Sequence, residues 1–312
     1  MRISAIKKNL HLIFSGRQTI TPFIWGKPGI GKSQLVRQVA LELGLDFIDL
    51  RLSQIDSTDL RGIPYAVPNE GLCKWLPPEF LPFEHLQKFK DTKGIVLLDE
   101  FNRARPDVLQ SAFQLILDRS VGINKLLDTW FIVAARNLGM EDRTDVMEMD
   151  SALRNRFIHF TVEVNLIDWI EWAECHQIHS DVINFINGKP NLLFQAPSSD
   201  EENVFVTPRS WEKFSDILIN NPNISPFEIT ESIGMNIING AAPHFIKYLE
   251  SRLTIPPAEI LDKYQTSKSK LRSLGRDQLY SLNIEISAYI VTELCALNEN
   301  QMTNLHDYGS EL

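Results

Sequence analysis

The sequence predicts a doubly wound α/β domain with a five-stranded parallel sheet, followed by a smaller all-helical domain. Over the first half of the chain, short apolar runs of β type alternate with segments of helical periodicity, as in consecutive βαβ units. A glycine-rich turn separates the first of these runs from the helical segment that follows it. After residue 165 the β-type runs largely stop, and the remaining segments have the helical period.

The predicted strands of the first domain are short and apolar, and they cover residues 21–25, 46–52, 94–98, 129–135 and 157–162. Residues 94–98 are apolar without interruption, which is typical of a strand buried on both faces of a parallel sheet. Helical periodicity covers residues 1–18, 32–43, 106–117 and 151–156. This alternation predicts the doubly wound arrangement.

The second domain is predicted from helical periodicity at residues 168–186, 210–219, 227–249 and 277–297. Residues 195–203 and 267–269 have the composition of loops, and the tail, residues 298–312, is polar enough for disorder. The chain has 312 residues, and a prior of roughly 150 residues per domain favours two domains. We therefore expect a boundary near residues 163–167, with domains 1–164 and 165–312.

Residues 53–82 form an insertion in the first domain, punctuated by glycine and proline. No helical or strand period covers the insertion as a whole. Gly71 and Trp75 fit either a short hairpin or a mobile loop. The sequence leaves these two alternatives open.

The composition bears on the partner and on the location of the protein in the cell. Asp and Glu number 40 against 31 Lys and Arg, which gives a net charge of −9, and no dense basic run is present, so nucleic acid is disfavoured as a partner. The 3 cysteines are widely spaced, as expected for reduced thiols in the cytosol. Residues 1–15 lack the uninterrupted apolar region of a signal peptide, so we expect none, and no apolar stretch approaches the ~20 residues that a membrane span requires. We therefore expect a cytoplasmic protein.

The glycine-rich turn, residues 26–33, matches the pattern G-x4-G-K-[ST]. Its glycines permit positive φ, so that successive N–H groups point at phosphate oxygens, and the following helix adds its positive end. Lys32 is expected to contact the β- and γ-phosphates and Ser33 to ligate magnesium. A chance match arises in about one chain in a hundred, and the strand before and helix after it make chance rarer still. The predicted nucleotide-binding residues are Gly26, Lys27, Pro28, Gly29, Ile30, Gly31, Lys32, Ser33 and Gln34.

Asp99 and Glu100 directly follow the buried strand 94–98, at the sheet edge where ligands bind in α/β folds. We expect Asp99 to hold the magnesium shell and Glu100 to orient and deprotonate the attacking water. Adjacent strand residues face opposite ways, which leaves each carboxylate its own task. Asn137 follows another strand and reaches the same edge, where its amide aligns the water, although an Asn after a strand also serves as a turn residue.

These features together resemble an AAA+ ATPase, and the sequence motifs are similar to those of the MoxR-type branch. The resemblance covers roughly residues 18–214 and rests on five phrases in order, which are residues 26–33, 99–104, 135–137, 152–157 and 207–210. The sequence departs from the family at Phe101, where isoleucine is frequent, and at Phe205 and Val206, which are larger than usual before the last phrase. Neither departure changes a group that contacts phosphate.

The resemblance implies that Asn137 is the first sensor, Arg156 the arginine finger that reaches a neighbouring subunit's nucleotide, and Arg209 the second sensor on a helical lid, residues 165–312. An arginine supplied in trans stabilises charge on the γ-phosphate and implies an oligomer, expected to be a hexameric ring. Without the family, Arg154 and Arg156 are surface cations near a helix end, and Arg209 is an arginine that starts a helix.

The resemblance also implies a function. It predicts hydrolysis of ATP with Mg²⁺ by a chaperone-like remodelling or assembly factor whose partner is a protein client, of the von Willebrand A-type or metallopeptidase-like kind. In such rings the inserted segment faces the pore or the client. A DNA-directed motor or helicase loader is the first alternative, and the charge of −9 disfavours it. A nucleotide-regulated scaffold with little turnover is the second, and Glu100 and Asn137 disfavour it.

Overall fold

The computed structural model describes residues 1–16, 20–137, 154–195, 205–252, 257–272 and 299–311, with isolated positions between residues 279 and 290. The chain divides into two compact units, Met1–Asp168 and Trp169–Leu312. None of the helices in these described ranges combines the length and apolar character that a bilayer crossing requires.

A five-stranded parallel sheet forms the centre of the first unit, in the order β2-β5-β8-β1-β9. The strands are β1 (Thr21–Gly26), β2 (Asp46–Arg51), β5 (Gly94–Asp99), β8 (Trp130–Asn137) and β9 (Phe157–Thr161). Together with the C-terminal helices, this sheet confirms the predicted fold class.

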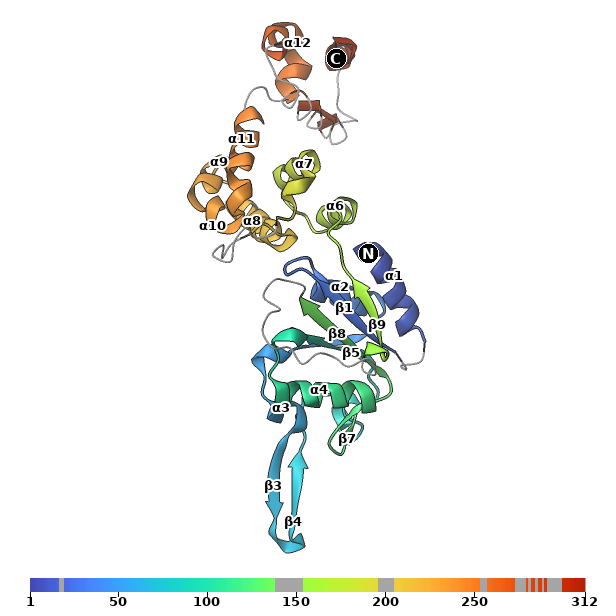
Figure 1. Ribbon diagram of the computed structural model, residues 1–312. Coiled ribbons are helices and arrows are strands. Elements are labelled where there is room, and N and C mark those ends of the chain that lie inside the picture. The colour runs from blue at the N-terminus through green and yellow to red at the C-terminus, as the bar shows by residue number, and fades with distance from the viewer. Residues whose placement is uncertain are drawn as a thin grey trace. The chain divides into compact units, whose positions relative to one another are not determined.

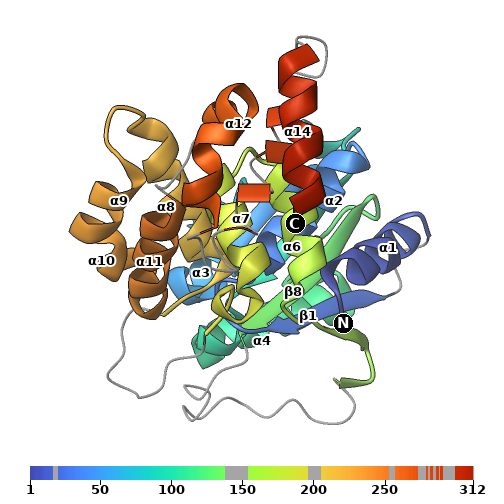
Figure 2. The same ribbon diagram turned by 90° about the horizontal axis from the view of Figure 1, so that it is seen from above.

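Helices cover both faces of the sheet. α1 (Ile3–Phe14) and α2 (Lys32–Glu42) lie on one face, and α4 (Pro106–Asp118) lies on the other (Figures 1 and 2). Val96 and Leu98 of β5 are fully buried and pack with Ala112 of α4. Removal of such side chains from water stabilises a fold by roughly 1.5–3 kcal/mol each, so this core fixes the sheet that carries the site.

The insertion contains a hairpin, which settles the alternative that the sequence left open. α3 (Ser57–Arg61) leads into β3 (Ile63–Val67), which pairs with the antiparallel strand β4 (Leu72–Leu76). The hairpin extends away from the sheet beyond α3 and α4 (Figure 1). Two shorter strands, β6 (Ser120–Val121) and β7 (Asn124–Lys125), follow α4.

Gly62 joins α3 to the hairpin in a conformation with φ of 89° and ψ of −171°, a region essentially reserved for glycine. A Cβ here would lie 2.0 Å from the Leu76 carbonyl oxygen. Since backbone cannot move aside as a side chain can, we expect Gly62→Ala to open the hairpin base and to speed proteolytic cleavage within residues 63–76.

The matched control for this prediction is Gly71→Ala at the hairpin tip. Gly71 also has a positive φ, of 64°, but nothing lies within 4 Å of its added Cβ. Limited proteolysis with mass mapping compares the two variants. Equal cleavage rates in both would show that the close approach at Gly62 does not hold the hairpin.

The second unit is helical. Its elements are α6 (Leu166–Cys175), which begins at the boundary, α7 (Ser180–Gly188), α8 (Pro208–Asn220), α9 (Pro226–Ile229), α10 (Met235–Ile237), α11 (Ala242–Arg252), α12 (Pro257–Leu271) and α14 (Glu299–Glu311). An aromatic core of Phe185, Trp211, Phe214 and Phe245 joins α7, α8 and α11, and Trp211 Nε1 donates to the Leu192 carbonyl at 2.9 Å. This aromatic core holds the helices of the second unit together.

Two predicted helices of this unit are each broken. Residues 168–186 divide between α6 and α7 because Gln177 adopts a left-handed conformation and the His179 amide donates to Ser215 Oγ at 2.8 Å. Residues 227–249 divide because a π-turn, Thr230–Gly234, and a 3₁₀ turn, Asn239–Ala241, interrupt the α-helical bonds.

Two predictions near the C-terminus are wrong. The expected loop at residues 267–269 belongs to α12, where Ser267 is buried. The polar tail is helix α14, which places Tyr308 and Leu305 against Tyr264 of α12. A few apolar side chains on one face were sufficient to order a segment whose average composition is polar. Most of the predicted helix 277–297 lies outside the described residues.

Candidate functional site

The glycine-rich turn connects Gly26, the last residue of β1, to Lys32, the first residue of α2. Gly29 and Gly31 have φ values of 75° and 92°, as predicted. The expectation that Gly26 also needs a positive φ is wrong, because its φ is not positive. A Cβ at Gly26 would instead lie 2.6 Å from Ile30 Cδ1 and 3.2 Å from Val162 Cβ, so this glycine is required for space.

The Lys32 side chain is buried beneath the turn, with a relative exposure of 6%. Its Nζ donates to the carbonyl oxygens of Gly26 and Lys27, both at 3.0 Å, and to Asn137 Oδ1 at 2.6 Å. These three oxygens fix the position of the ammonium group. A buried ammonium group held in this way is a favourable partner for an anion.

Ser33 and Asp99 bring two hard oxygen donors together. Ser33 Oγ donates a hydrogen bond to Asp99 Oδ2, and the Glu100 amide donates to Asp99 Oδ1 at 2.7 Å. Within the described ranges no group of three His, Cys, Asp or Glu side chains gathers into a metal cage. A hydroxyl and one carboxylate suit Mg²⁺, which takes one or two protein ligands and fills its shell with phosphate and water. The donor set therefore fits Mg²⁺.

Glu100 lies just beyond the end of β5 in a left-handed conformation, with φ of 56° and ψ of 37°. The two carboxylates therefore separate because the backbone turns at Glu100, and the strand alternation expected from the sequence does not apply. Such a conformation costs a non-glycine residue roughly 1–2 kcal/mol and is concentrated at functional sites. The Glu100 carboxylate accepts a hydrogen bond from Ser53 Oγ.

Ser53 is the residue of this edge that sequence reasoning missed. It belongs to a 3₁₀ turn, Leu52–Gln54, that directly follows β2, and β2 pairs with β5. The carboxyl ends of adjacent parallel strands meet at one edge. Ser53 directly follows the predicted second strand, and this position could have placed it near Glu100 from the sequence alone.

Asp49 of β2 is a further carboxyl group in the same region. Its Oδ1 is buried and accepts no hydrogen bond from the described part of the chain. Burial and the nearby Asp99 and Glu100 raise the pKa of Asp49, against the opposing effect of Arg51 and Arg37. The carboxylates at this edge therefore favour a cation beside them.

Asn137 is the last residue of β8 and lies beside Gly26 in the sheet register. Its side-chain Oδ1 accepts the Lys32 hydrogen bond, and its backbone N–H donates to Asn102 Oδ1 at 3.3 Å. The structure thus brings Lys32, Ser33 and Asn137 together with the acidic pair at the carboxyl ends of three strands, β1, β5 and β8.

The remaining predicted residues are at the surface or in other elements. Lys27, Pro28 and Gln34 are exposed around the turn, whereas Ile30 is buried. Arg156 is exposed directly before β9. Arg209 is exposed near the start of α8, in the second unit. The sequence phrase 152–157 begins outside the described residues.

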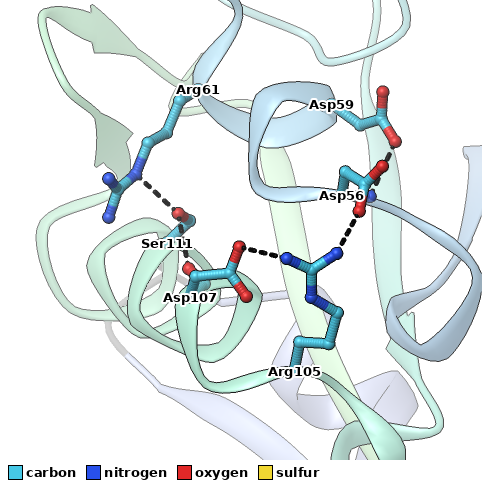
Figure 3. Close-up of polar contacts among 6 residues, drawn as sticks. All are labelled: Asp56, Asp59, Arg61, Arg105, Asp107 and Ser111. Carbon is cyan, nitrogen blue, oxygen red and sulfur yellow. Dashed lines mark hydrogen bonds and ion pairs between the residues drawn. The ribbon is translucent and has the colours of Figure 1, made fainter.

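A polar network anchors the hairpin base to α4 (Figure 3). The Arg105 guanidinium bonds Asp56 Oδ1 at 2.6 Å and Asp107 Oδ2 at 3.3 Å. Arg61 Nε donates to Ser111 Oγ at 2.8 Å, and this hydroxyl is fully buried. A hydrogen bond from the Ser57 hydroxyl lowers the pKa of Asp107, with desolvation acting against it and the nearby Arg105 acting in the same direction as Ser57.

This network joins the segment that follows Glu100 to the segment that follows Ser53. The Arg105–Asp56 ion pair holds α3 against the start of α4, and the Asp56 amide donates to Asp59 Oδ2 at 2.9 Å to cap α3. Its charged groups are exposed, so the ion pair by itself adds little stability. Its effect is to fix where the hairpin leaves the domain.

Residues 22–157 match the family described as AAA domain (dynein-related subfamily). A comparison with curated proteins gave no match. Among solved structures, a RuvB variant from Thermotoga maritima is similar with 16% identity over 89% of this chain and 86% of that chain, at a TM-score of 0.45. NtrX from Brucella abortus is similar with 13% identity over 96% of this chain and 62% of that chain, at a TM-score of 0.44.

The assignment rests on the family match together with the order of the sheet and the position of the glycine-rich turn. Residues 22–157 therefore form a domain of the AAA type, with the P-loop α/β fold of AAA+ proteins.

Proposed function

We propose that this protein binds ATP with Mg²⁺ at the glycine-rich turn, hydrolyses it, and uses the cycle to remodel or assemble a partner protein, in the manner of the MoxR-type branch. The observation that carries this proposal is the convergence of Lys32, Ser33 and Asn137 with Asp99 and Glu100 at one sheet edge. These groups supply a cation for phosphate, oxygens for magnesium and a base for water.

The turn supplies the phosphate contacts. Backbone N–H groups between Gly29 and Ser33, at the positive N-terminal end of α2, bind the β- and γ-phosphates together with Lys32. The three uncharged oxygens around Lys32 Nζ hold its ammonium beneath the turn in readiness for that charge. Preorganised charge of this kind costs no rearrangement during the reaction.

Ser33 and Asp99 would hold Mg²⁺, and the bound ion would act as a Lewis acid on the phosphate oxygens. Glu100 accepts a proton from the attacking water, and Asn137 orients that water with its amide. The hydrogen bond from Ser53 sets the position of the Glu100 carboxylate before the water is bound. Each step therefore uses a separate side chain.

Arg156 and Arg209 complete the site in our proposal. Arg156 is exposed, as a group must be if it acts on the nucleotide of a neighbouring subunit. This role requires an oligomer, which we propose to be a hexameric ring. Arg209 is the second sensor, and the helical domain expected from the sequence, residues 165–312, is the lid that closes when ATP binds. A nucleotide drives such closure only if it binds the closed state better than the open one.

The hairpin is our proposed contact with the client. Five of its large apolar side chains are exposed, which are Ile63, Tyr65, Leu72, Trp75 and Leu76. Exposed apolar clusters mark interaction surfaces, and a two-stranded hairpin alone is marginally stable in water. We propose a von Willebrand A-type or metallopeptidase-like protein as the partner.

Replacement of Lys32 tests the proposed function. We expect Lys32→Ala to weaken ATP binding about 10- to 100-fold, because hydrogen bonds to charged groups contribute roughly 1.5–3 kcal/mol. Isothermal calorimetry with ATP and Mg²⁺ measures this change, and circular dichroism confirms that the variant is folded. ATP hydrolysis, measured as phosphate release, should fall with binding.

Lys125→Ala is the control, because Lys125 is an exposed lysine of β7 that pairs with Glu84. It should bind ATP as the unchanged protein does. Unchanged affinity in Lys32→Ala would overturn the assignment of the turn. Salt-dependent binding of DNA by the unchanged protein would support the alternative of a DNA-directed motor.

A further inference from the structure

A chain of two contacts connects the strand before the glycine-rich turn to the turn that carries Arg156. Trp25 directly precedes Gly26, and its Nε1 donates to His159 Nδ1 at 2.9 Å. The other ring nitrogen, His159 Nε2, lies 3.2 Å from the carbonyl oxygen of Arg154. His159 thus bridges β1 and the segment just before β9.

The partners of the ring define the state of His159. An indole N–H can only donate, so Nδ1 must accept and carries no proton. A carbonyl oxygen can only accept, so Nε2 must carry the proton. One neutral tautomer therefore satisfies both contacts at once, and the bridge has a defined direction from Trp25 through His159 to Arg154.

Packing holds the Trp25 end of the bridge in place. The Trp25 ring lies edge-on to Phe23 at 4.7 Å, and the Arg136 guanidinium lies 5.0 Å over it. The Val162 amide also donates to the Trp25 carbonyl at 2.7 Å. The His159 ring itself lies edge-on to Phe23 at 5.7 Å. The anchor is therefore part of the sheet that carries the phosphate loop.

The Arg154 end of the bridge closes an exposed turn. Asn155 and Arg156 lie between Arg154 and β9, and both are exposed. A long side chain on an exposed turn reaches a fixed point only if its backbone is held. A misplacement of about 1 Å can lower a rate about 100-fold, so the contact that holds this backbone matters for catalysis.

We propose that His159 is a positioning residue for the arginine supplied in trans, since it fixes the turn of Arg156 to the strand that ends in the phosphate loop. This inference rests on the proposed function of Arg156. It adds that the position of each arginine is set by the nucleotide-binding strand of its own subunit. His159 contacts no nucleotide in this role.

A mixture of two impaired chains separates this role from a local effect on the phosphate loop. Lys32→Ala chains have a defective nucleotide site and supply Arg156, whereas Arg156→Ala chains have an intact site and supply no arginine. If arginine acts in trans, the mixture hydrolyses ATP although each chain alone does not. Added to the arginine-supplying chain, His159→Phe should lower the activity of the mixture about 10- to 100-fold.

The same substitution on the Arg156→Ala chain is the internal control. His159→Phe keeps a ring against Phe23 and removes both hydrogen bonds, and on this chain we expect less than about a twofold effect. His159→Gln on the arginine-supplying chain retains an N–H donor for the Arg154 carbonyl and should restore part of the activity. His176→Phe is the matched control, because His176 is an exposed histidine that stacks on Trp172 and bonds its carbonyl oxygen at 2.8 Å.

The possible results distinguish the two levels of the proposal. Equal loss of activity from His159→Phe on either chain, or no loss on the arginine-supplying chain, would overturn the positioning role while the trans arginine stands. A parent mixture without activity would overturn the proposed function of Arg156, and this inference with it. Loss confined to the arginine-supplying chain, with partial rescue by His159→Gln, supports it.

Discussion

Arg156→Ala should lower the kcat of ATP hydrolysis about 10³-fold or more while the affinity for ATP stays nearly unchanged. An arginine that acts on the nucleotide of a neighbouring subunit stabilises charge on the γ-phosphate chiefly in the transition state, and such an arginine contributes about 10³ to 10⁵ in rate. Its removal therefore affects turnover far more than ground-state binding. Phosphate release at saturating ATP and calorimetry measure the two quantities separately.

The neighbouring Arg154→Ala is the control for this prediction. Both arginines are exposed, but only the backbone carbonyl of Arg154 takes part in the contacts described, and alanine retains it. We expect nearly unchanged turnover in Arg154→Ala. If both variants lost activity equally, or neither did, Arg156 would be a surface cation near a helix end and not a finger. A monomer under saturating ATP and Mg²⁺ would count against the same assignment.

Glu100→Gln should bind ATP and hydrolyse it about 10² to 10⁴ times more slowly. The amide keeps the size and the hydrogen-bonding capacity of the side chain, including a partner for Ser53, but it cannot accept a proton from water. Since Lys32, Ser33 and Asp99 are unchanged, nucleotide and magnesium should remain bound. Single-turnover hydrolysis measures the chemical step.

The trapped state also offers a route to the partner. In the Glu100→Gln variant, ATP-bound oligomers should accumulate, and size-exclusion chromatography with light scattering gives their mass. A pull-down with this variant should recover the client more completely than the unchanged protein does. Glu84→Gln, which changes an exposed glutamate paired with Lys125, is the control. Hydrolysis at the normal rate in Glu100→Gln would remove Glu100 from the mechanism.

The sequence predicted the sheet and the residues at the ends of its strands well because these depend on local patterns. Residues 94–98 are apolar throughout and are followed by Asp99, so both the buried strand and its acidic end can be recognised from the sequence alone. The glycine-rich turn follows an apolar strand and precedes a helix, as its motif requires. For the same reason, Asn137 could be placed at the carboxyl end of its strand.

What the sequence did not predict depends on contacts between distant segments. Ser53 reaches Glu100 only because β2 and β5 are neighbours, and His159 meets Trp25 only because β9 pairs with β1. The tail helix α14 was missed because Tyr308 packs against α12, far away in sequence. Periodicity also overlooked the break at Gln177, which a left-handed residue creates inside an otherwise helical pattern.

We propose above all that the turn between β1 and α2 binds a triphosphate beside Asp99 and Glu100. A crystal structure with Mg²⁺ and a non-hydrolysable ATP analogue tests this most directly. We expect the phosphates on the N–H groups of residues 29–33, Lys32 in contact with them, and the Ser33–Asp99 hydrogen bond replaced by shared coordination of the metal. An analogue bound elsewhere, with that hydrogen bond intact, would contradict the account.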